Sequence, residues 1–187
     1  MRIISGDARG RNLFAPQGRE TRPTSDKIRG SMFNIIGSRV IDARVIDLFG
    51  GTGALALEAL SRGAAFAVIV DSSRQAMQCI ERNARNVLKD DFDRRAQLLK
   101  ADYRAAIERA QGPFDMVFLD PPYRMVEVYA DALFRLRDKL SGGCLVVLER
   151  LKSAQVPLPD GFERKDERFY GDTAVEFIEL TGREARS

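Results

Sequence analysis

The middle of the sequence repeats one pattern, in which a short apolar segment carries an aspartate at or near its end and a segment with helical spacing follows. The apolar segments are residues 45–49, 66–70, 96–101 and 116–119, and their aspartates are Asp47, Asp71, Asp102 and Asp120. Short segments that are apolar almost throughout are typical of strands buried on both faces. Alternation of such strands with helices predicts an α/β fold with a mostly parallel sheet and helices on both faces.

Further strand candidates extend this sheet toward the C-terminus. Residues 143–149 are mostly apolar after a glycine and predict a fifth strand. Residues 162–170 and 174–180 lie on either side of Gly171 and Asp172, a pair that is typical of the turn in a β-hairpin. We therefore expect a hairpin after the fifth strand.

The first thirty residues carry most of the positive charge. They contain seven basic and three acidic side chains, a net charge of +4, whereas the whole chain of 187 residues has a net charge of +3. The remainder is therefore slightly acidic. Basic residues gathered in one segment favour contact with a polyanion such as a nucleic acid, although a charge run more often forms a solvated face.

A hairpin is expected at the start of this basic segment. Residues 2–5 and 12–14 are short strand candidates around a loop that contains two glycines and an aspartate. Arg9 and Arg11 lie in or just after that loop. Residues 16–23 are rich in proline, glycine and polar types and read as a linker.

A helix is expected after the linker. Thr24 or Ser25 can cap its start, and Gly37 lies near its end. The apolar positions at helical spacing are Ile28, Met32, Ile35 and Ile36. We expect this stripe to be buried and Lys27 and Arg29 to be left free.

The composition excludes several kinds of chemistry. The chain has no histidine, which removes the commonest general base and every nucleophile pair built on histidine. Cys79 and Cys144 lie far apart without metal-ligand spacing, so we expect neither a disulfide nor a metal site. No apolar run approaches the roughly 20 residues of a membrane helix, and the N-terminus lacks the apolar stretch of a signal peptide. We therefore expect a cytoplasmic protein that does not enter membranes.

The glycine-rich residues 50–53 have two readings. Their spacing formally fits a dinucleotide fingerprint, and Asp71 lies at the distance expected for a ribose-binding carboxylate. Asp47 argues against NAD, because a carboxylate sits badly beside a pyrophosphate at a helix N-terminus. S-adenosylmethionine has no phosphates and carries a sulfonium and an ammonium group, so we prefer it as the cofactor. The cofactor-binding candidates are Asp47, Phe49, Gly50, Gly51, Gly53, Asp71 and Asp102.

Residues 120–123 (Asp-Pro-Pro-Tyr) end the fourth strand in a rigid corner. The two prolines have no backbone N–H for a sheet ladder and fix φ near −65°. The corner leaves a carboxylate, proline carbonyls and an aromatic ring around one small volume, which suits a flat group that bears an amine. An ordinary turn after a strand is the alternative reading. The catalytic candidates are Asp120, Pro121, Pro122 and Tyr123.

Several motifs together carry a resemblance to a known family. They are residues 47–53 (Asp-Leu-Phe-Gly-Gly-Thr-Gly), 58–64 (Glu-Ala-Leu-Ser-Arg-Gly-Ala), the corner at 120–123, and N-terminal motifs within 2–11 and 22–34. From Met1 to about Leu180 the chain resembles the bacterial small-subunit ribosomal RNA methyltransferase D family, the 16S rRNA (guanine(966)-N(2))-methyltransferases. The corner alone is shared with amine methyltransferases of DNA, RNA and protein, and the N-terminal motifs make the resemblance specific.

The resemblance implies a Rossmann-like class I methyltransferase fold, with a seven-stranded sheet whose last strand is antiparallel and a small N-terminal hairpin and helix. It divides the chain into an RNA-binding extension (1–37), an S-adenosylmethionine-dependent methyltransferase domain (38–180) and a frayed tail (181–187). It implies methyl transfer to the exocyclic 2-amino group of one guanine in 16S rRNA, presented in a small ribosomal subunit particle. The RNA-binding candidates are Arg9, Arg11, Arg22 and Arg29.

Two alternatives stay open. One is an exocyclic-amine methyltransferase that acts on DNA adenine or on a protein amide, although no separate DNA-recognition domain is visible in 187 residues. The other is an NAD-binding or non-enzymatic Rossmann protein, which Asp47 and the two prolines of the corner disfavour. We expect a monomer, because no long exposed apolar stripe demands a partner.

Overall fold

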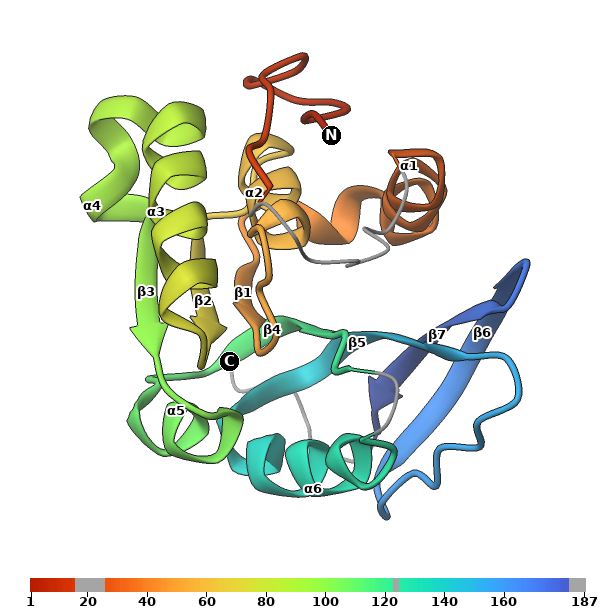
Figure 1. Cartoon of the computed structure of the whole chain (residues 1–187). Helices are drawn as coiled ribbons and strands as arrows, with labels where there is room; N and C mark the ends of the chain where they lie inside the picture. The colour runs from red at the N-terminus through yellow and green to blue at the C-terminus, as the bar shows by residue number, and fades with distance from the viewer. Residues whose placement is uncertain (16–25, 123–124, 182–187) are drawn as a thin grey trace.

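The computed structural model describes residues 1–15, 26–122 and 125–181 (Figure 1). Several expectations from the sequence concern residues outside these ranges. They are the linker at 16–23, the helix cap at Thr24 or Ser25, the RNA contact of Arg22, the catalytic role of Tyr123, and the tail at 182–187.

A seven-stranded sheet runs through the molecule in the order β3-β2-β1-β4-β5-β7-β6. The strands are β1 (Arg44–Asp47), β2 (Phe66–Asp71), β3 (Ala96–Lys100), β4 (Phe114–Leu119), β5 (Leu140–Leu151), β6 (Phe162–Tyr170) and β7 (Thr173–Leu180). The first five pair in parallel, and β7 is antiparallel to both of its neighbours, β5 and β6. The predicted Rossmann-like sheet with an antiparallel last strand is confirmed.

Helices cover both faces of the sheet (Figure 1). The α-helices are α1 (Asp26–Ile36), α2 (Ala54–Ser61), α3 (Arg74–Leu88), α4 (Phe92–Arg95), α5 (Tyr103–Arg109) and α6 (Glu127–Leu136), and short 3-10 turns are η1 (Gly37–Val40), η2 (Lys89–Asp91) and η3 (Arg137–Lys139). One apolar core joins the sheet to α1, α2 and α3, and a second joins it to α5 and α6.

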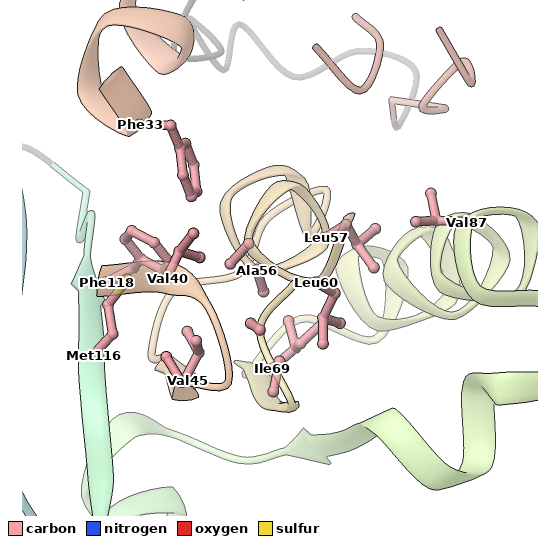
Figure 2. Packing of buried hydrophobic residues seen from close by; sticks show 14 of the residues in the cluster. Phe33, Val40, Val45, Ala56, Leu57, Leu60, Ile69, Val87, Met116 and Phe118 are labelled. Carbon is pink, nitrogen blue, oxygen red and sulfur yellow. The ribbon is translucent and has the colours of Figure 1, made fainter. Parts of the chain in front are cut away.

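Successive residues of each strand belong alternately to the two cores, which explains why the strands are apolar throughout. On β1, Val45 belongs to the core beneath α1 to α3, whereas Ile46 belongs to the core beneath α5 and α6. On β4, Phe118 joins the first core and packs against Phe33 of α1, with ring centroids 5.8 Å apart (Figure 2). Helix α1 is thereby held against the sheet by an aromatic contact.

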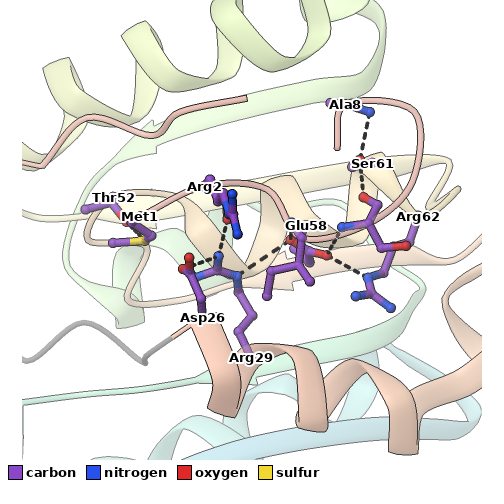
Figure 3. Close-up of polar contacts among 11 residues, drawn as sticks. Met1, Arg2, Ala8, Asp26, Arg29, Thr52, Glu58, Ser61 and Arg62 are labelled. Atoms are coloured by element: carbon purple, nitrogen blue, oxygen red, sulfur yellow. Dashed lines mark hydrogen bonds and ion pairs between the residues drawn. The ribbon is translucent and has the colours of Figure 1, made fainter. Parts of the chain in front are cut away.

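The N-terminal segment pairs with itself over a shorter length than the predicted hairpin. Arg2 and Asn12 form a single antiparallel bridge, and the Ile3 amide donates to the Arg11 carbonyl at 2.9 Å. The loop of this pairing docks on the C-terminal end of α2 instead of extending a ladder. There the Ser61 hydroxyl donates to the Ser5 carbonyl at 2.6 Å and accepts from the Ala8 amide at 3.0 Å (Figure 3).

Helix α1 faces the core differently from the prediction. Met32 and Ile36 are buried as expected, but Ile35 is 37% exposed and Arg29 is fully buried. The expectation that Arg29 is free is therefore wrong. Its guanidinium donates to the Arg2 carbonyl and to Asp26, and it lies 3.6 Å from the Oε2 atom of Glu58 (Figure 3).

Glu58 on α2 is the centre of this buried polar contact. Its carboxylate accepts from the amides of Ile4 at 2.8 Å and Ser5 at 3.0 Å, and from the Nε atom of Arg62 at 2.7 Å. A buried carboxylate is tolerated when it is paired and hydrogen-bonded in this way. Glu58 therefore fixes the N-terminal segment and α1 to the same helix.

None of the helices in the described part of the chain combines the length and the apolar character that a membrane span requires.

Replacing Gly6 by alanine should strongly destabilise the protein. Gly6 has φ +83°, and a Cβ atom there would lie 1.7 Å from the Ser61 carbonyl oxygen. The N-terminal loop would have to leave α2, so we expect the free energy of unfolding to fall by about 3 kcal/mol or more in a denaturant titration.

Gly10→Ala is the matched control. Gly10 has nearly the same φ, +82°, but a Cβ atom there would meet nothing within 4 Å. Only the backbone conformation should oppose this substitution, at about 1–2 kcal/mol. Equal losses of stability in the two variants would contradict the docking of this loop on α2.

Candidate active site

The carboxyl ends of β1 and β4 meet where the order of the parallel strands reverses. In open α/β sheets this position forms the crevice in which ligands bind. Asp47 is the last residue of β1, and Asp120 directly follows β4. Asp71 ends β2, the neighbour of β1 on its other side. The predicted site residues on these strands therefore share one edge of the sheet.

Three carboxylates gather at the ends of three adjacent strands. Asp47 on β1 is 1% exposed, Glu149 on β5 is 4% exposed, and Asp120 after β4 is partly buried. The pairing of Leu119 with Leu148 places Asp120 beside Glu149. Each of the three follows by two positions a residue of the core beneath α1 to α3, so strand alternation directs all of them toward that face.

Burial makes the negative charge of this cluster costly. Desolvation raises the pKa of Asp47 to about 7, and the nearby charge of Asp71 adds to the rise. Desolvation raises the pKa of Asp120 well above its ordinary value, and the charges of Glu149 and Asp47 raise it further. A positively charged ligand would offset both effects. The cluster is therefore suited to a cation-bearing ligand and unsuited to a pyrophosphate.

The glycine loop approaches the sheet closely at Gly50. Its amide donates to the Val70 carbonyl at 2.7 Å, and a Cβ atom on Gly50 would lie 2.7 Å from the side chain of Ile69. Gly53 has φ +79° and immediately precedes α2. These positions require glycine, and they bring the loop backbone against the ends of β1 and β2.

Asp71 holds this loop from the neighbouring strand. Its carboxylate accepts from the Gly51 amide at 3.0 Å and from the Ser73 amide at 2.8 Å. Asp47 similarly accepts from the Phe49 amide at 3.3 Å. Both aspartates thus fix the backbone that is predicted to bind the cofactor.

Asp102 stands at the N-terminus of α5 and caps it. Its Oδ1 atom accepts from the amides of Arg104 at 2.9 Å and Ala105 at 3.2 Å. The next residue, Tyr103, lies against Phe49, with ring centroids 5.8 Å apart. Asp102 is exposed, so its cap role leaves it accessible to a ligand. Its cofactor role stays a prediction.

The proline corner follows Asp120 directly after the end of β4. Pro121 is buried and Pro122 is exposed. The Pro122 carbonyl accepts from the Met125 amide at 3.0 Å and is thereby committed to the turn. Asp120 and the Pro121 carbonyl are the candidates that are left to receive an amine. Tyr123 lies outside the described residues.

The predicted RNA-binding arginines differ in their surroundings. Arg9 is exposed at the N-terminal loop. Arg11 donates to the carbonyls of Asn86 at 2.6 Å and Val87 at 2.9 Å, at the C-terminal end of α3. Arg29 is buried and offers no surface to RNA, and Arg22 lies outside the described residues.

Two residues of this region were missed by reasoning from sequence. Glu149 follows the apolar run of residues 144–148 in β5, and a carboxylate at the end of such a run was a signal available in the sequence. Asn83 is fully buried on α3 and contacts the glycine loop. Its polar side chain beside the apolar positions of that helix was a weaker signal.

Among the described residues, no three acidic, cysteine or histidine side chains lie close enough together to hold a metal ion, and this includes the three carboxylates at the strand ends.

Comparison with known proteins places the chain in a family. Residues 1–179 match the family model described as conserved hypothetical protein 95. YlbH of Bacillus subtilis, provisionally named an rRNA methyltransferase, is 36% identical over 97% of this chain and 100% of its own length. Ribosomal RNA small subunit methyltransferase D of Escherichia coli is 36% identical over 66% of this chain and 61% of its own length. The chain belongs to the ribosomal RNA small subunit methyltransferase D family.

Solved structures agree with the methyltransferase D family in fold. A protein from Escherichia coli provisionally named methyltransferase yhhF has a TM-score of 0.86 and 27% identity, and the match covers 98% of this chain and 99% of that one. A more distant structure, that of SMU.776, a protein provisionally named a methyltransferase and solved with S-adenosylhomocysteine, shares the fold at a TM-score of 0.62 and 16% identity over 82% of this chain and 48% of that one. The fold is that of Rossmann-like class I methyltransferases, whose cofactor is S-adenosylmethionine.

In this methyltransferase D family member, Asp47→Asn should change how stability depends on pH. The pKa of Asp47 is about 7 in the folded protein and 3.8 as the ordinary value. The folded state therefore retains a proton that the unfolded state loses, and the free energy of unfolding falls as pH rises from about 4 to about 7. The full fall is about 4 kcal/mol.

Asparagine cannot ionise, so the ligand-free Asp47→Asn variant should lack this fall and be more stable than wild type at pH 8. Thermal unfolding across pH 4 to 8 measures it. Asp160→Asn, on the exposed surface, is the control and should follow the wild type. If Asp47→Asn also followed the wild type, charge burial at Asp47 would not be the cause.

Proposed function

We propose that this protein transfers a methyl group from S-adenosylmethionine to the exocyclic 2-amino group of one guanine in 16S rRNA. The observation that carries the proposal is the carboxylate cluster of Asp47, Asp120 and Glu149, which includes the aspartate of the Asp-Pro-Pro corner. Membership of the methyltransferase D family supports the substrate class, since its named relatives are small-subunit rRNA methyltransferases.

The residues of the glycine loop fit S-adenosylmethionine better than a dinucleotide. The loop backbone approaches closely at Gly50, and Asp71 can accept from a ribose hydroxyl with the lone pairs that its two backbone contacts leave. Asp47 places negative charge where a pyrophosphate would be repelled and a cation attracted. When bound, S-adenosylmethionine supplies a methyl group carried by a positively charged sulfur.

Asp120 and the Pro121 carbonyl would receive the two hydrogens of the guanine amine. The amine is a weak nucleophile because its lone pair is delocalised into the ring. Two acceptors orient that lone pair toward the methyl carbon and stabilise the positive charge that develops on nitrogen. A carbon–nitrogen bond forms, the carbon–sulfur bond breaks with its electron pair going to sulfur, and the nitrogen then loses a proton.

The charge state of Asp120 is coupled to cofactor binding in this scheme. Without a ligand, burial and the charges of Glu149 and Asp47 raise the pKa of Asp120 and favour its protonated form. A neighbouring cation lowers that pKa and restores the carboxylate, which is the form that accepts amine hydrogens. The carboxylate can afterwards take the proton that the nitrogen loses. The chain has no histidine, and this route requires none.

The RNA would contact the basic N-terminal segment, chiefly through phosphates. Arg9 is exposed for such a contact, whereas the Nη1 atom of Arg11 donates to carbonyls at the end of α3. Arg22 stays in the proposal, whereas buried Arg29 does not. We further propose that the protein acts as a monomer on a small ribosomal subunit particle.

Asp120→Ala should lower the methylation rate constant at least about 100-fold, because the acceptor that orients the amine is lost. Binding of S-adenosylhomocysteine, measured by calorimetry, should stay within a few fold of wild type. The control is Asp160→Ala, which removes an exposed carboxylate in the segment just before β6. An Asp120→Ala enzyme with near wild-type turnover would remove Asp120 from the mechanism.

Arg9→Ala should weaken binding to a 16S rRNA fragment at low salt. Each lost phosphate contact lowers the slope of log affinity against log salt by about 0.7–1. Filter binding at several salt concentrations measures that slope. Arg109→Ala on α5, an exposed arginine on the opposite side of the sheet, should leave it unchanged. If Arg9→Ala left the slope of log affinity against log salt unchanged, Arg9 would not contact an RNA phosphate.

A further inference from the structure

Asn83 on α3 is a fully buried amide whose polar atoms all have partners. Its Oδ1 atom accepts from the Phe14 amide at 2.8 Å. Its Nδ2 atom donates to the Phe14 carbonyl at 3.0 Å and to the Thr52 carbonyl at 2.8 Å. One side chain thus satisfies both backbone groups of Phe14 and one carbonyl of the glycine loop.

The two partners of Asn83 belong to different parts of the proposed site. Thr52 lies in the glycine loop between Gly51 and Gly53, where we place the cofactor. Phe14 belongs to the basic N-terminal segment, where we place the RNA, and lies one residue before the end of the described range 1–15. Among the described residues, Asn83 is hydrogen-bonded to both.

Neighbouring residues strengthen the hold on Phe14 and on Thr52. The Cys79 thiol donates to the Phe14 carbonyl at 3.0 Å, and the Arg82 guanidinium lies 3.3 Å from the centroid of the Phe14 ring. The Thr52 hydroxyl points to the Met1 sulfur at 3.8 Å. Side chains of α3 therefore hold Phe14, and Met1 of the N-terminal segment contacts Thr52 of the glycine loop.

We propose that Asn83 is a positioning residue that couples RNA binding at the N-terminal segment to cofactor binding at the glycine loop. This inference rests on the proposed function. If either Phe14 or Thr52 moves away, polar atoms of the amide lose their partners inside a buried environment, which is unfavourable. A ligand that orders one segment therefore favours the bound arrangement of the other, and the effect is reciprocal.

The test measures S-adenosylhomocysteine affinity by calorimetry with and without a 16S rRNA fragment. In the wild type we expect the RNA to tighten this affinity at least about fivefold, the lower end of common coupling between sites. Asn83→Ala should reduce the ratio of the two affinities to near one. A wild-type ratio near one, or an undiminished ratio in Asn83→Ala, overturns the inference.

Asn86→Ala is the matched control. Asn86 lies one turn further along α3 and donates to the Asn12 carbonyl at 3.0 Å, so it contacts the N-terminal segment without reaching the glycine loop. It should retain the wild-type ratio. If Asn86→Ala also reduced the ratio of the two affinities to near one, the effect would come from a general loosening of the N-terminal segment. That result would overturn the specific role of Asn83.

Hydrogen exchange on the wild type provides a test that does not depend on a variant that folds. The RNA fragment alone should slow amide exchange at residues 50–53 through the contact with Asn83, and unchanged exchange overturns the inference. If the RNA fragment and S-adenosylhomocysteine both bind but neither changes the affinity of the other, the inference fails and the proposed function stands. If the protein binds neither RNA nor S-adenosylhomocysteine, the proposed function and the inference fail together.

Discussion

Burial of carboxylates at the ends of adjacent parallel strands is the constraint on which the site depends. Asp47 and Glu149 are almost inaccessible to water, and Asp120 lies between their strands. Such a cluster is unfavourable when it is empty and ionised, and it becomes favourable when a cation arrives. In the proposed function, a sulfonium ligand would lower this electrostatic cost, and the amine would bind beside the same carboxylates at the corner after β4.

The N-terminal segment is anchored by a second buried charge, Glu58 on α2. Its carboxylate receives the amides of Ile4 and Ser5 and lies beside Arg29 of α1. Because α2 begins directly after the glycine loop, one short helix follows that loop at its start and holds the basic segment through Glu58 and Ser61. The segment is thus positioned by contacts with the methyltransferase sheet and its helices.

The sequence predicted those features that depend on local pattern. Strands buried on both faces are apolar throughout, and aspartates at their ends are visible without a structure, so the sheet and the residues Asp47, Asp71 and Asp120 could be found. Arg29 could not be placed correctly, because its partner Glu58 lies 29 positions away and only the packing of α1 on α2 brings them together. Asn83 could not be identified from the sequence for the same reason, since its role depends on the distant residues Phe14 and Thr52.

The central claim is that these carboxylates direct a methyl group to a guanine amine in small-subunit rRNA. The most direct measurement offers S-adenosylmethionine with a labelled methyl group together with 16S rRNA, small subunits that lack the modification, or DNA. The nucleic acid is then digested, and the labelled nucleoside is identified by mass spectrometry. We predict N2-methylguanosine from the 16S rRNA of the subunits. Label in DNA adenine, in protein, or at another position of the base would contradict the account.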